Sequence, residues 1–272
     1  MKNHSGFISN TEEQTLYMLG KNTFGQLGIG TMMDSFKKNQ TLDGVVDFGI
    51  GIYHTTALSK DGDVFCAGQG FSSIFEPVPG LHNIKKIGVS FFRSYAIDEI
   101  GHLYEWSNRD DVHIVDTDRA VKDLAVGGKF YYLLDEQGGL GMCGNNSSGQ
   151  LLVRVPFLKN VVWIEDERAE MIAAGSHHFV YLAGGQVKYL GSDTHGQMPR
   201  DVYGRVYDIS CGEYSTTVKT DWFHYMFGMF RFPYEIAPER DKVRAVPVGG
   251  GQIMLPDEQV SFDIYAGGED EQ

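Results

Sequence analysis

A glycine-marked loop that recurs along the chain limits its possible folds more than any other feature. The fullest copy reads GKNTFGQLGIG, from Gly20 to Gly30, and fainter copies read GNNSSGQLL from Gly144 and GSDTHGQMP from Gly191. A short apolar run precedes each copy (TLYML, LGMC and VKYL), as expected of a strand that leads into a turn. The sequence therefore predicts an array of similar β-units.

A longer repeat unit surrounds this loop. Residues 45–68 read VVDFGIGIYHTTALSKDGDVFCAG, which predicts three strands, with a glycine turn after the first and an Asp61-Gly62 hairpin after the second. The position that closes the third strand recurs about every 37 to 48 residues, a period typical of radial or solenoid arrays. These closing positions are Gly20, Gly68, Ser107, Gly144, Gly191, Gly228 and Gly267.

Several short strands per unit, with no helix between them, favour a β-propeller, because radial repetition leaves only short sheet edges. We therefore expect an all-β fold, a seven-bladed β-propeller that forms one domain over residues 1–272, with further hairpins at Gly138-Gly139 and Gly184-Gly185. The first unit lacks its leading strand, and the C-terminal segment VRAVPVGGG (243–251) is expected to supply it and close the ring. The units span about residues 4–44, 45–83, 84–120, 121–169, 170–205, 206–242 and 243–268.

Composition excludes several classes of partner. The 34 glycines, 17 phenylalanines and 14 tyrosines suit a sheet protein with many tight turns, and a net charge of −13 argues against direct binding of nucleic acid or of an anionic membrane. No apolar run is long enough for a membrane-spanning helix, and the N-terminal MKNHSGFISN lacks the apolar core of a signal peptide. With three widely spaced cysteines, we expect a cytoplasmic or nuclear protein with reduced thiols.

Motifs for catalysis, cofactors and metals are missing or out of context. The GLGMCG stretch, Gly139–Gly144, matches a dinucleotide-binding pattern, but it lies in a predicted hairpin with no following helix. His177, His178 and His195 show no ligand pairing that would define a tetrahedral metal site. No nucleophile is paired with a base. We expect a protein that is not an enzyme, with no catalytic residue, no metal and no cofactor.

Several conspicuous side chains have a structural interpretation. His54 and His178 occupy the histidine position of the repeat, where an imidazole is expected to bond the turn of its own blade. Cys66 and Cys143 lie at or near the ends of equivalent strands and are expected to be small core residues. Core or half-core positions are also expected for Trp106 and Trp222, and the acidic GGEDEQ end is expected to be solvated.

The unit resembles the repeat of the regulator of chromosome condensation family, a seven-bladed propeller. Its first half is best kept at Val45–Leu58 and its second half at Leu16–Gly28, and the resemblance extends over about residues 4 to 268. Other units are degraded: the loops after Gly68 and Trp106 have lost the Gly-Gln pair. Fold carries across such decay better than function does.

The resemblance implies two functions. The founding activity of the family is nucleotide exchange on the small GTPase Ran, which would need a wedge-like insertion, whereas the connections here are short and no basic tail is seen. A compact branch of the family, the α-tubulin-suppressor or killer-toxin-insensitivity proteins, is similar in brevity and in the segment Thr194–Pro199. That likeness implies a non-catalytic adaptor that partners a small zinc-binding electron-carrier protein in diphthamide synthesis and tRNA wobble-uridine modification. A secreted inhibitor would require a signal peptide.

Strand order also predicts which face binds a partner. The glycine turn after the first strand and the loop after the third strand should lie on the same face of the propeller. On this face some units carry aromatic and charged residues where the family has small residues, histidine, asparagine or Gly-Gln. Exposed aromatic and arginine side chains in loops are typical of binding hot spots, although these aromatics could instead plug the channel mouth. The predicted partner-binding residues are Phe91, Phe92, Arg93, Arg109, Asp110, Asp111, Phe230, Arg231 and Phe232.

Overall fold

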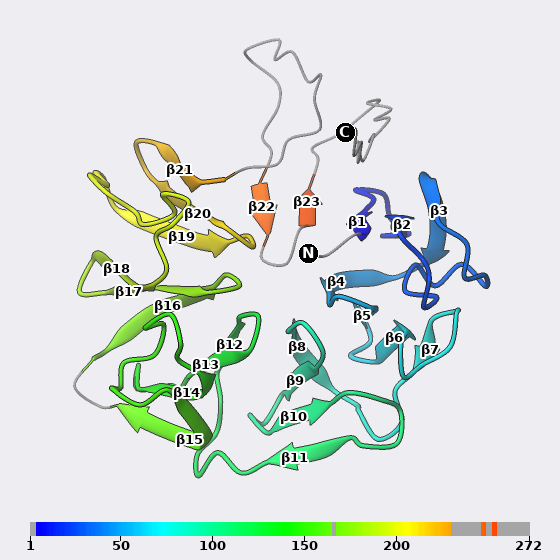
Figure 1. Cartoon of the computed structure of the whole chain (residues 1–272), viewed down its shortest axis with the longest axis horizontal. Helices are drawn as coiled ribbons and strands as arrows, with labels where there is room; N and C mark the ends of the chain where they lie inside the picture. Colours follow the sequence, from blue (N-terminus) through cyan, green and yellow to red (C-terminus); the bar gives the residue numbers. More distant parts are fainter. Residues whose placement is uncertain (1–3, 165–166, 230–245, 249–251, 255–272) are drawn as a thin grey trace, which may run out of the picture.

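The computed structural model describes residues 4–164, 167–229, 246–248 and 252–254, and the last two ranges are described only as strands. All regular elements in these residues are β-strands, which form six sheets arranged as a ring around a common centre (Figure 1). The described ranges contain no helix, and hence none that could cross a membrane. The prediction of an all-β propeller is confirmed.

Five of the six sheets each correspond to one sequence unit, and the remaining sheet combines β1, β2 and β3 of the first unit with two strands of the last unit; each sheet is called a blade. The first blade holds β1 (His4–Ile8), β2 (Leu16–Gly20) and β3 (Ser35–Leu42); the second holds β4 (Val45–Ile50), β5 (His54–Ser59), β6 (Val64–Gly68) and β7 (Glu76–Pro77). The third holds β8 (Ile84–Val89), β9 (Ser94–Asp98), β10 (Leu103–Trp106) and β11 (His113–Val115). The fourth holds β12 (Asp123–Val126), β13 (Phe130–Leu134), β14 (Leu140–Asn145) and β15 (Phe157–Ile164). The fifth holds β16 (Ala169–Ala174), β17 (His178–Ala183) and β18 (Gln186–Gly191), and the sixth holds β19 (Val206–Cys211), β20 (Ser215–Thr220) and β21 (His224–Gly228).

The predicted hairpins are confirmed. Antiparallel pairing joins β5 to β6 across Asp61-Gly62, β13 to β14 across Gly138-Gly139, and β17 to β18 across Gly184-Gly185. Gly62 has a φ of 81°, in the left-handed region that favours glycine at such a tight turn. The local turn chemistry of the sequence therefore fixes these strand pairs.

The ring closes through the C-terminal strands, but not as predicted in detail. β23 (Gln252–Met254) pairs with β1 in parallel, and β22 (Val246–Val248) pairs with β23. The strand beside β1 thus follows the VRAVPVGGG segment instead of belonging to it. β22 also contacts β19 of the sixth blade, and β1 contacts β4, so the contacts run round the ring. The rest of the seventh unit lies outside the described residues.

The hydrophobic core lies between neighbouring blades. The inner strands β4, β8, β12, β16 and β19 contact one another in succession around the centre. Each of the middle strands β9, β13 and β17 is buried along its whole length, because it is covered by a blade on either side. Trp106 is fully buried between the second and third blades, as predicted, whereas Trp222 is 66% exposed and that expectation was wrong. Cys66 and Cys143 are buried core residues, as expected.

Histidine side chains connect successive blades. The Nε2 atom of His54 is hydrogen-bonded to Ser94 Oγ of the next blade at 3.1 Å, and His178 Nε2 is hydrogen-bonded to Thr216 Oγ1 at the same distance. His4 Nε2 makes the equivalent contact with Thr55 Oγ1 at 3.0 Å. The expected role was structural, and these side-chain hydrogen bonds reach the neighbouring blade. The His54 ring also packs against Gly51 in the turn of its own blade. The three hydrogen bonds between blades are called the histidine latches.

Glycines in two of the inner strands, β4 and β8, set how closely the neighbouring blades approach. A Cβ atom on Gly88 would collide with Val126 of the next inner strand and would lie 3.0 Å from Leu124. We expect Gly88→Ala to lower the free energy of unfolding by about 1–3 kcal/mol, because the inserted methyl overpacks the blade interface. Denaturant unfolding checks this. Lys85→Ala, at an exposed position of the same strand, should change the free energy of unfolding by less than about 0.5 kcal/mol. Equal effects of the two substitutions would contradict the packing argument.

A second prediction concerns pH. Burial lowers the pKa of His178 from its ordinary value to about 4, because the charged imidazolium is disfavoured away from water. Between about pH 6.5 and pH 4 the unfolded chain therefore binds a proton that the folded chain does not, so stability falls as the pH falls. The variant His178→Gln lacks this pH-dependent loss of stability. As the pH falls from about 6.5 to about 4, the difference in unfolding free energy between the unsubstituted protein and the variant should narrow by up to about 1.4 kcal/mol for each pH unit.

The matched control for this experiment is Thr216→Val, which removes the same hydrogen bond but keeps the imidazole. Its stability deficit should stay nearly constant over the same pH range. Stability curves measured at several pH values check both variants. If the deficit of His178→Gln does not depend on pH, a buried neutral His178 is ruled out.

Candidate protein-binding face

The loops predicted to share one face do share it. The backbone N–H of Gln69, after β6, donates to the carbonyl of Tyr53 in the β4–β5 turn at 2.8 Å. The same pairing joins Asn145 to Lys129 at 2.9 Å and Ser192 to His177 at 3.0 Å. We call this side of the propeller the turn face. It consists of the turns 51–53, 90–93, 127–129, 175–177 and 212–214 and of the loops that follow the third strands.

Backbone hydrogen bonds tie five successive turns of this face together. The N–H of Ile52 donates to the carbonyl of Phe91 at 2.9 Å, and the N–H of Phe91 donates to that of Gly128 at 3.1 Å. The chain continues from Gly128 N–H to the carbonyl of Ser176 and from Ser176 N–H to that of Glu213, both at 3.1 Å. Side chains on the turn face therefore project from a braced backbone, which reduces the entropy lost on binding.

The β8–β9 turn differs from its counterparts in length and in side chains. It spans residues 90–93, whereas the β4–β5 turn spans only residues 51–53. Phe91 is half-buried and lines the central cavity, where its ring lies so close to Gly128 that a Cβ atom there would approach within 2.6 Å. Phe92 points outward and is 52% exposed. The two phenylalanines therefore differ in position: Phe91 lies at the channel mouth, and Phe92 is available at the surface.

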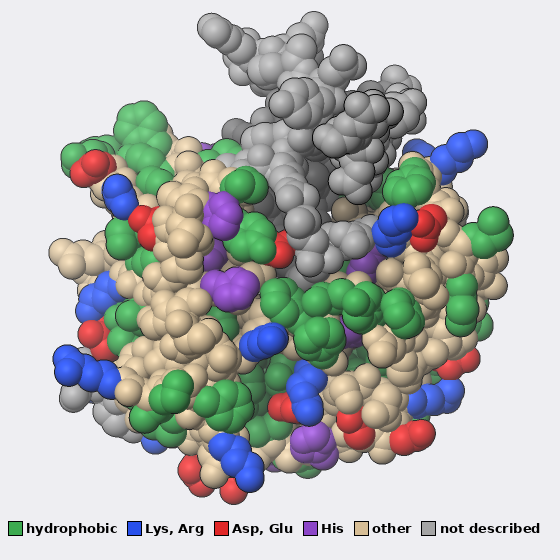
Figure 2. All heavy atoms as spheres, viewed as in Figure 1, with side chains coloured by type: hydrophobic (Ala, Val, Ile, Leu, Met, Phe, Trp, Pro, Cys, Tyr) green, Lys and Arg blue, Asp and Glu red, His purple; other side chains and the backbone are tan. Residues whose placement is uncertain are grey.

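An aromatic row extends from Phe92 in both directions. The ring centroids of Phe92 and Tyr53 are 6.5 Å apart, and those of Tyr53 and Phe24 are 4.6 Å apart. On the other side, Phe91 lies 6.3 Å from Phe92 and 6.3 Å from His177. Figure 2 shows a band of hydrophobic side chains across the middle of the molecule, with histidines at one end. These five residues, drawn from four blades, are called the aromatic row.

The predicted charged residues are engaged within the chain. Arg93 forms an ion pair with Glu105, and Arg109 forms one with Glu76 at 2.8 Å. Both guanidinium groups are partly exposed, so these pairs contribute little to stability. They do neutralise charge on the face around the aromatic row.

The loop after β10 is braced by the predicted residue Asp111. Its carboxylate accepts hydrogen bonds from the backbone of Ser107 and Asn108, both at 2.9 Å, and from the Ser107 hydroxyl at 2.7 Å. Burial alone would raise the pKa of Asp111, but these hydrogen bonds hold it below its ordinary value. Asp110 is exposed beside it. Phe230, Arg231 and Phe232 lie outside the described residues.

Sequence reasoning missed Phe24, Tyr53 and His177 as members of the row. Tyr53 and His177 directly precede a middle strand, and Arg93, Lys129 and Tyr214 hold the same place in their units. Aligning the units on this one position is the signal that could have found them. Phe24 lies in the best-kept copy of the glycine loop and gives no such signal.

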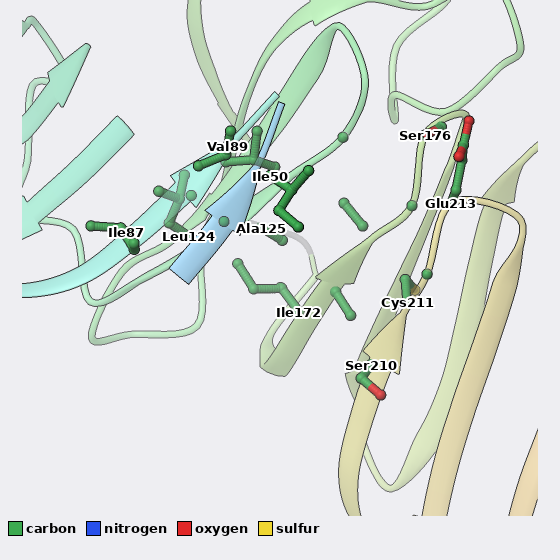
Figure 3. A pocket seen from close by; sticks show the side chains of 18 of the residues that line it. Ile50, Ile87, Val89, Leu124, Ala125, Ile172, Ser176, Ser210, Cys211 and Glu213 are labelled. Atoms are coloured by element: carbon green, nitrogen blue, oxygen red, sulfur yellow. The ribbon is translucent and has the colours of Figure 1, made fainter. Parts of the chain in front are cut away.

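The central cavity lies between the inner strands and has a volume of about 280 Å³. Its wall is largely apolar, with Ile50, Val89, Leu124 and Ile172 among the lining residues (Figure 3). Asp47 and Lys86 also line it, and Lys86 forms an ion pair with Asp123. Burial raises the pKa of Asp47 to about 6. In the described part of the chain, no group of three or more histidine, cysteine or acidic side chains could hold a metal ion.

Cys211 is the one thiol among the residues that line the cavity. Burial raises its pKa to about 12, so the thiolate needed for nucleophilic attack or metal binding is suppressed at neutral pH. The geometry thus offers a rigid, aromatic protein surface and gives no support to a catalytic centre in the cavity.

Comparisons with known proteins agree with the repeat pattern. No protein-family model matches the chain. An RCC1 repeat-containing protein of Dictyostelium discoideum is 29% identical over 38% of this chain and 26% of its own length. The human probable E3 ubiquitin-protein ligase HERC6 is 28% identical over 72% of this chain and 24% of its own length. The human X-linked retinitis pigmentosa GTPase regulator is 23% identical over 84% of this chain and 22% of its own length. The chain thus spans about a quarter of the length of these relatives.

Solved structures share the fold. Human WBSCR16 superposes with a TM-score of 0.70 at 15% identity, over 84% of this chain and 74% of its own. Prp20p of Saccharomyces cerevisiae, studied for its binding to Gsp1p and histones, superposes with a TM-score of 0.69 at 16% identity. The superposition covers 84% of this chain and 70% of Prp20p. The chain therefore has the β-propeller fold of these structures, and its repeats are similar to those of RCC1 repeat-containing proteins, in agreement with the sequence resemblance.

The division between Phe91 and Phe92 predicts different stability effects. Phe91→Ala should lower the free energy of unfolding by about 1–3 kcal/mol, because it removes a half-buried ring that packs on Gly128 and His177. Phe92→Ala removes an exposed ring and should change it by less than about 0.5 kcal/mol. Chemical unfolding of the two variants side by side checks this, and a larger loss for Phe92→Ala would reverse the assignment.

Proposed function

We propose that this chain is a non-catalytic protein-binding propeller that acts as an adaptor through its turn face. The aromatic row carries the proposal. It places exposed rings from three successive blades next to one another, and the turns that carry Tyr53 and Phe92 are hydrogen-bonded to each other. Aromatic side chains held on a rigid scaffold lose little entropy on binding and are over-represented among interface hot spots.

The sequence resemblance suggests the adaptor's partner: a small zinc-binding electron-carrier protein that serves diphthamide synthesis and tRNA wobble-uridine modification. Short connections favour this reading. Within residues 4–164 and 167–229 the longest segments between strands are 21–34 and 192–205, which leave little room for an inserted wedge. Such a role needs no cofactor in the propeller and places the chain in the cytoplasm or nucleus.

Nucleotide exchange on a Ran-type GTPase is the second candidate. The fold similarity to Prp20p, a protein studied for its binding to Gsp1p, is the observation that favours it. The two candidates differ in a measurable way, because an exchange factor accelerates nucleotide release from its GTPase and an adaptor does not. Release of labelled GDP from Ran, with and without the purified chain, separates them.

Partner capture tests the proposed face. The purified chain serves as bait in an extract of its native cells, and mass spectrometry identifies what is retained. The double variant Tyr53→Ala with Phe92→Ala should lose at least about tenfold in retained partner, because two adjacent hot-spot rings are removed. Ile100→Ala is the matched control, since Ile100 is an exposed apolar residue in the β9–β10 hairpin of the same blade, at the opposite face. If the double variant still captures the partner and Ile100→Ala does not, binding belongs to the opposite face.

A further inference from the structure

An unpaired carboxylate stands at the mouth of the central cavity. Glu213 lies in the turn between β19 and β20, is half-buried, and lines the cavity together with Phe91 and Ser176. Its backbone carbonyl accepts the Ser176 N–H, and Figure 3 shows its side chain alongside Ser176. Among the described residues, its carboxylate has no hydrogen-bond or ion-pair partner.

Phe91 lines this mouth, and further rings lie on the adjoining turns and loops. Phe91 faces the cavity, and its ring lies 6.3 Å from that of His177, which follows Ser176 in the same turn. Tyr214 follows Glu213, and its ring lies 4.5 Å from that of His195. Ring faces next to a carboxylate form a favourable environment for a cation, which is attracted both to the π-electrons and to the negative charge.

Several other charged side chains of the turn face form ion pairs, whereas the exposed Asp110 forms none among the described residues. Ion pairs join Lys21 to Asp34 at 2.8 Å and Arg200 to Asp193 at 2.7 Å, in addition to the pairs of Arg93 and Arg109. Lys129, which forms no ion pair within the described ranges, lies on the β12–β13 turn, with the β16–β17 turn between it and Glu213. The carboxylate of Glu213 is therefore available for a positive group from outside. The net charge of −13 also favours approach of a basic partner.

The size of the cavity limits what can enter. A volume of about 280 Å³ lies at or below the lower end of small-molecule pockets, about 300–1,000 Å³. One long side chain fits this space better than a nucleotide or cofactor. A side chain that enters from the turn face would place its charged end beside Glu213 and its methylene stem against the Phe91 ring at the rim.

We propose that the mouth of the cavity is a subsite for a positively charged side chain of the docked partner, with arginine preferred over lysine. The planar guanidinium can stack on the Phe91 ring and donate two hydrogen bonds to the Glu213 carboxylate, which an ammonium group cannot do in the same geometry. This subsite rests on the proposed protein-binding function and adds the chemistry that the partner must present.

The test uses a library of short random peptides, selected on the purified full-length chain and, in parallel, on Glu213→Gln. Peptides selected on the unsubstituted chain should share an arginine or lysine at a fixed position, and this enrichment should vanish on Glu213→Gln. For one selected peptide, calorimetry should give about a tenfold weaker affinity for Glu213→Gln, and a similar loss when its arginine is replaced by the neutral isostere citrulline. Glu99→Gln, at an exposed position of the opposite face, should bind as the unsubstituted chain does.

Two failures of this experiment are distinguishable. If the selected peptides lose affinity for the variant Tyr53→Ala with Phe92→Ala but show no enriched basic residue and bind Glu213→Gln equally well, the cation subsite is wrong and the docking face stands. If the peptides bind that double variant unchanged, the docking face itself is wrong. Equal loss with Glu213→Gln and Glu99→Gln would show only a general charge effect and would also overturn the subsite.

Discussion

Packing between neighbouring blades is the interaction on which this structure depends. Each sheet has only a few strands, and its apolar side chains are buried by the next blade rather than within the sheet. Gly49 and Gly88 lie where a Cβ atom would collide with a valine of the adjacent inner strand, so the blades approach with almost no spare distance. The histidine latches add polar contacts at the same interfaces. A blade is therefore stable only as part of the ring.

This dependence explains what could be predicted from the sequence. Strands and hairpins follow from local signals, such as Asp61-Gly62 between two apolar runs, and those predictions are confirmed. Relations between units are not local. The hydroxyl partner of His54 lies in the next blade, and β23 reaches β1 only when the ring closes. No periodicity within one unit contains that information.

The residues of the candidate site likewise fall into those that the sequence reveals and those that only the structure brings together. Phe91 and Phe92 could be found from the sequence because they replace small residues in a single turn. Phe24 and Tyr53 sit in the best-kept parts of the repeat and join the row only through the order of the blades. The availability of charged side chains could not be predicted from the sequence. Arg93 and Asp111 stand out there as candidate binding residues, yet in the structure Arg93 pairs with Glu105 and Asp111 accepts hydrogen bonds from the loop backbone.

The braced turns also explain why this face, and not the inner strands, can diverge between units. Inner-strand positions such as Gly88 are constrained by the neighbouring blade, so most substitutions there weaken the ring. On the turn face the backbone is held by hydrogen bonds from Ile52 through Glu213 that do not involve side chains. The residue before each middle strand varies between units, from Tyr53 to His177. The turn glycine Gly128 remains constrained, because a Cβ atom there would collide with Phe91 and with the Ser176 carbonyl. The separation of a constrained interior from a braced but variable surface is the physical condition under which one propeller fold can acquire different partners.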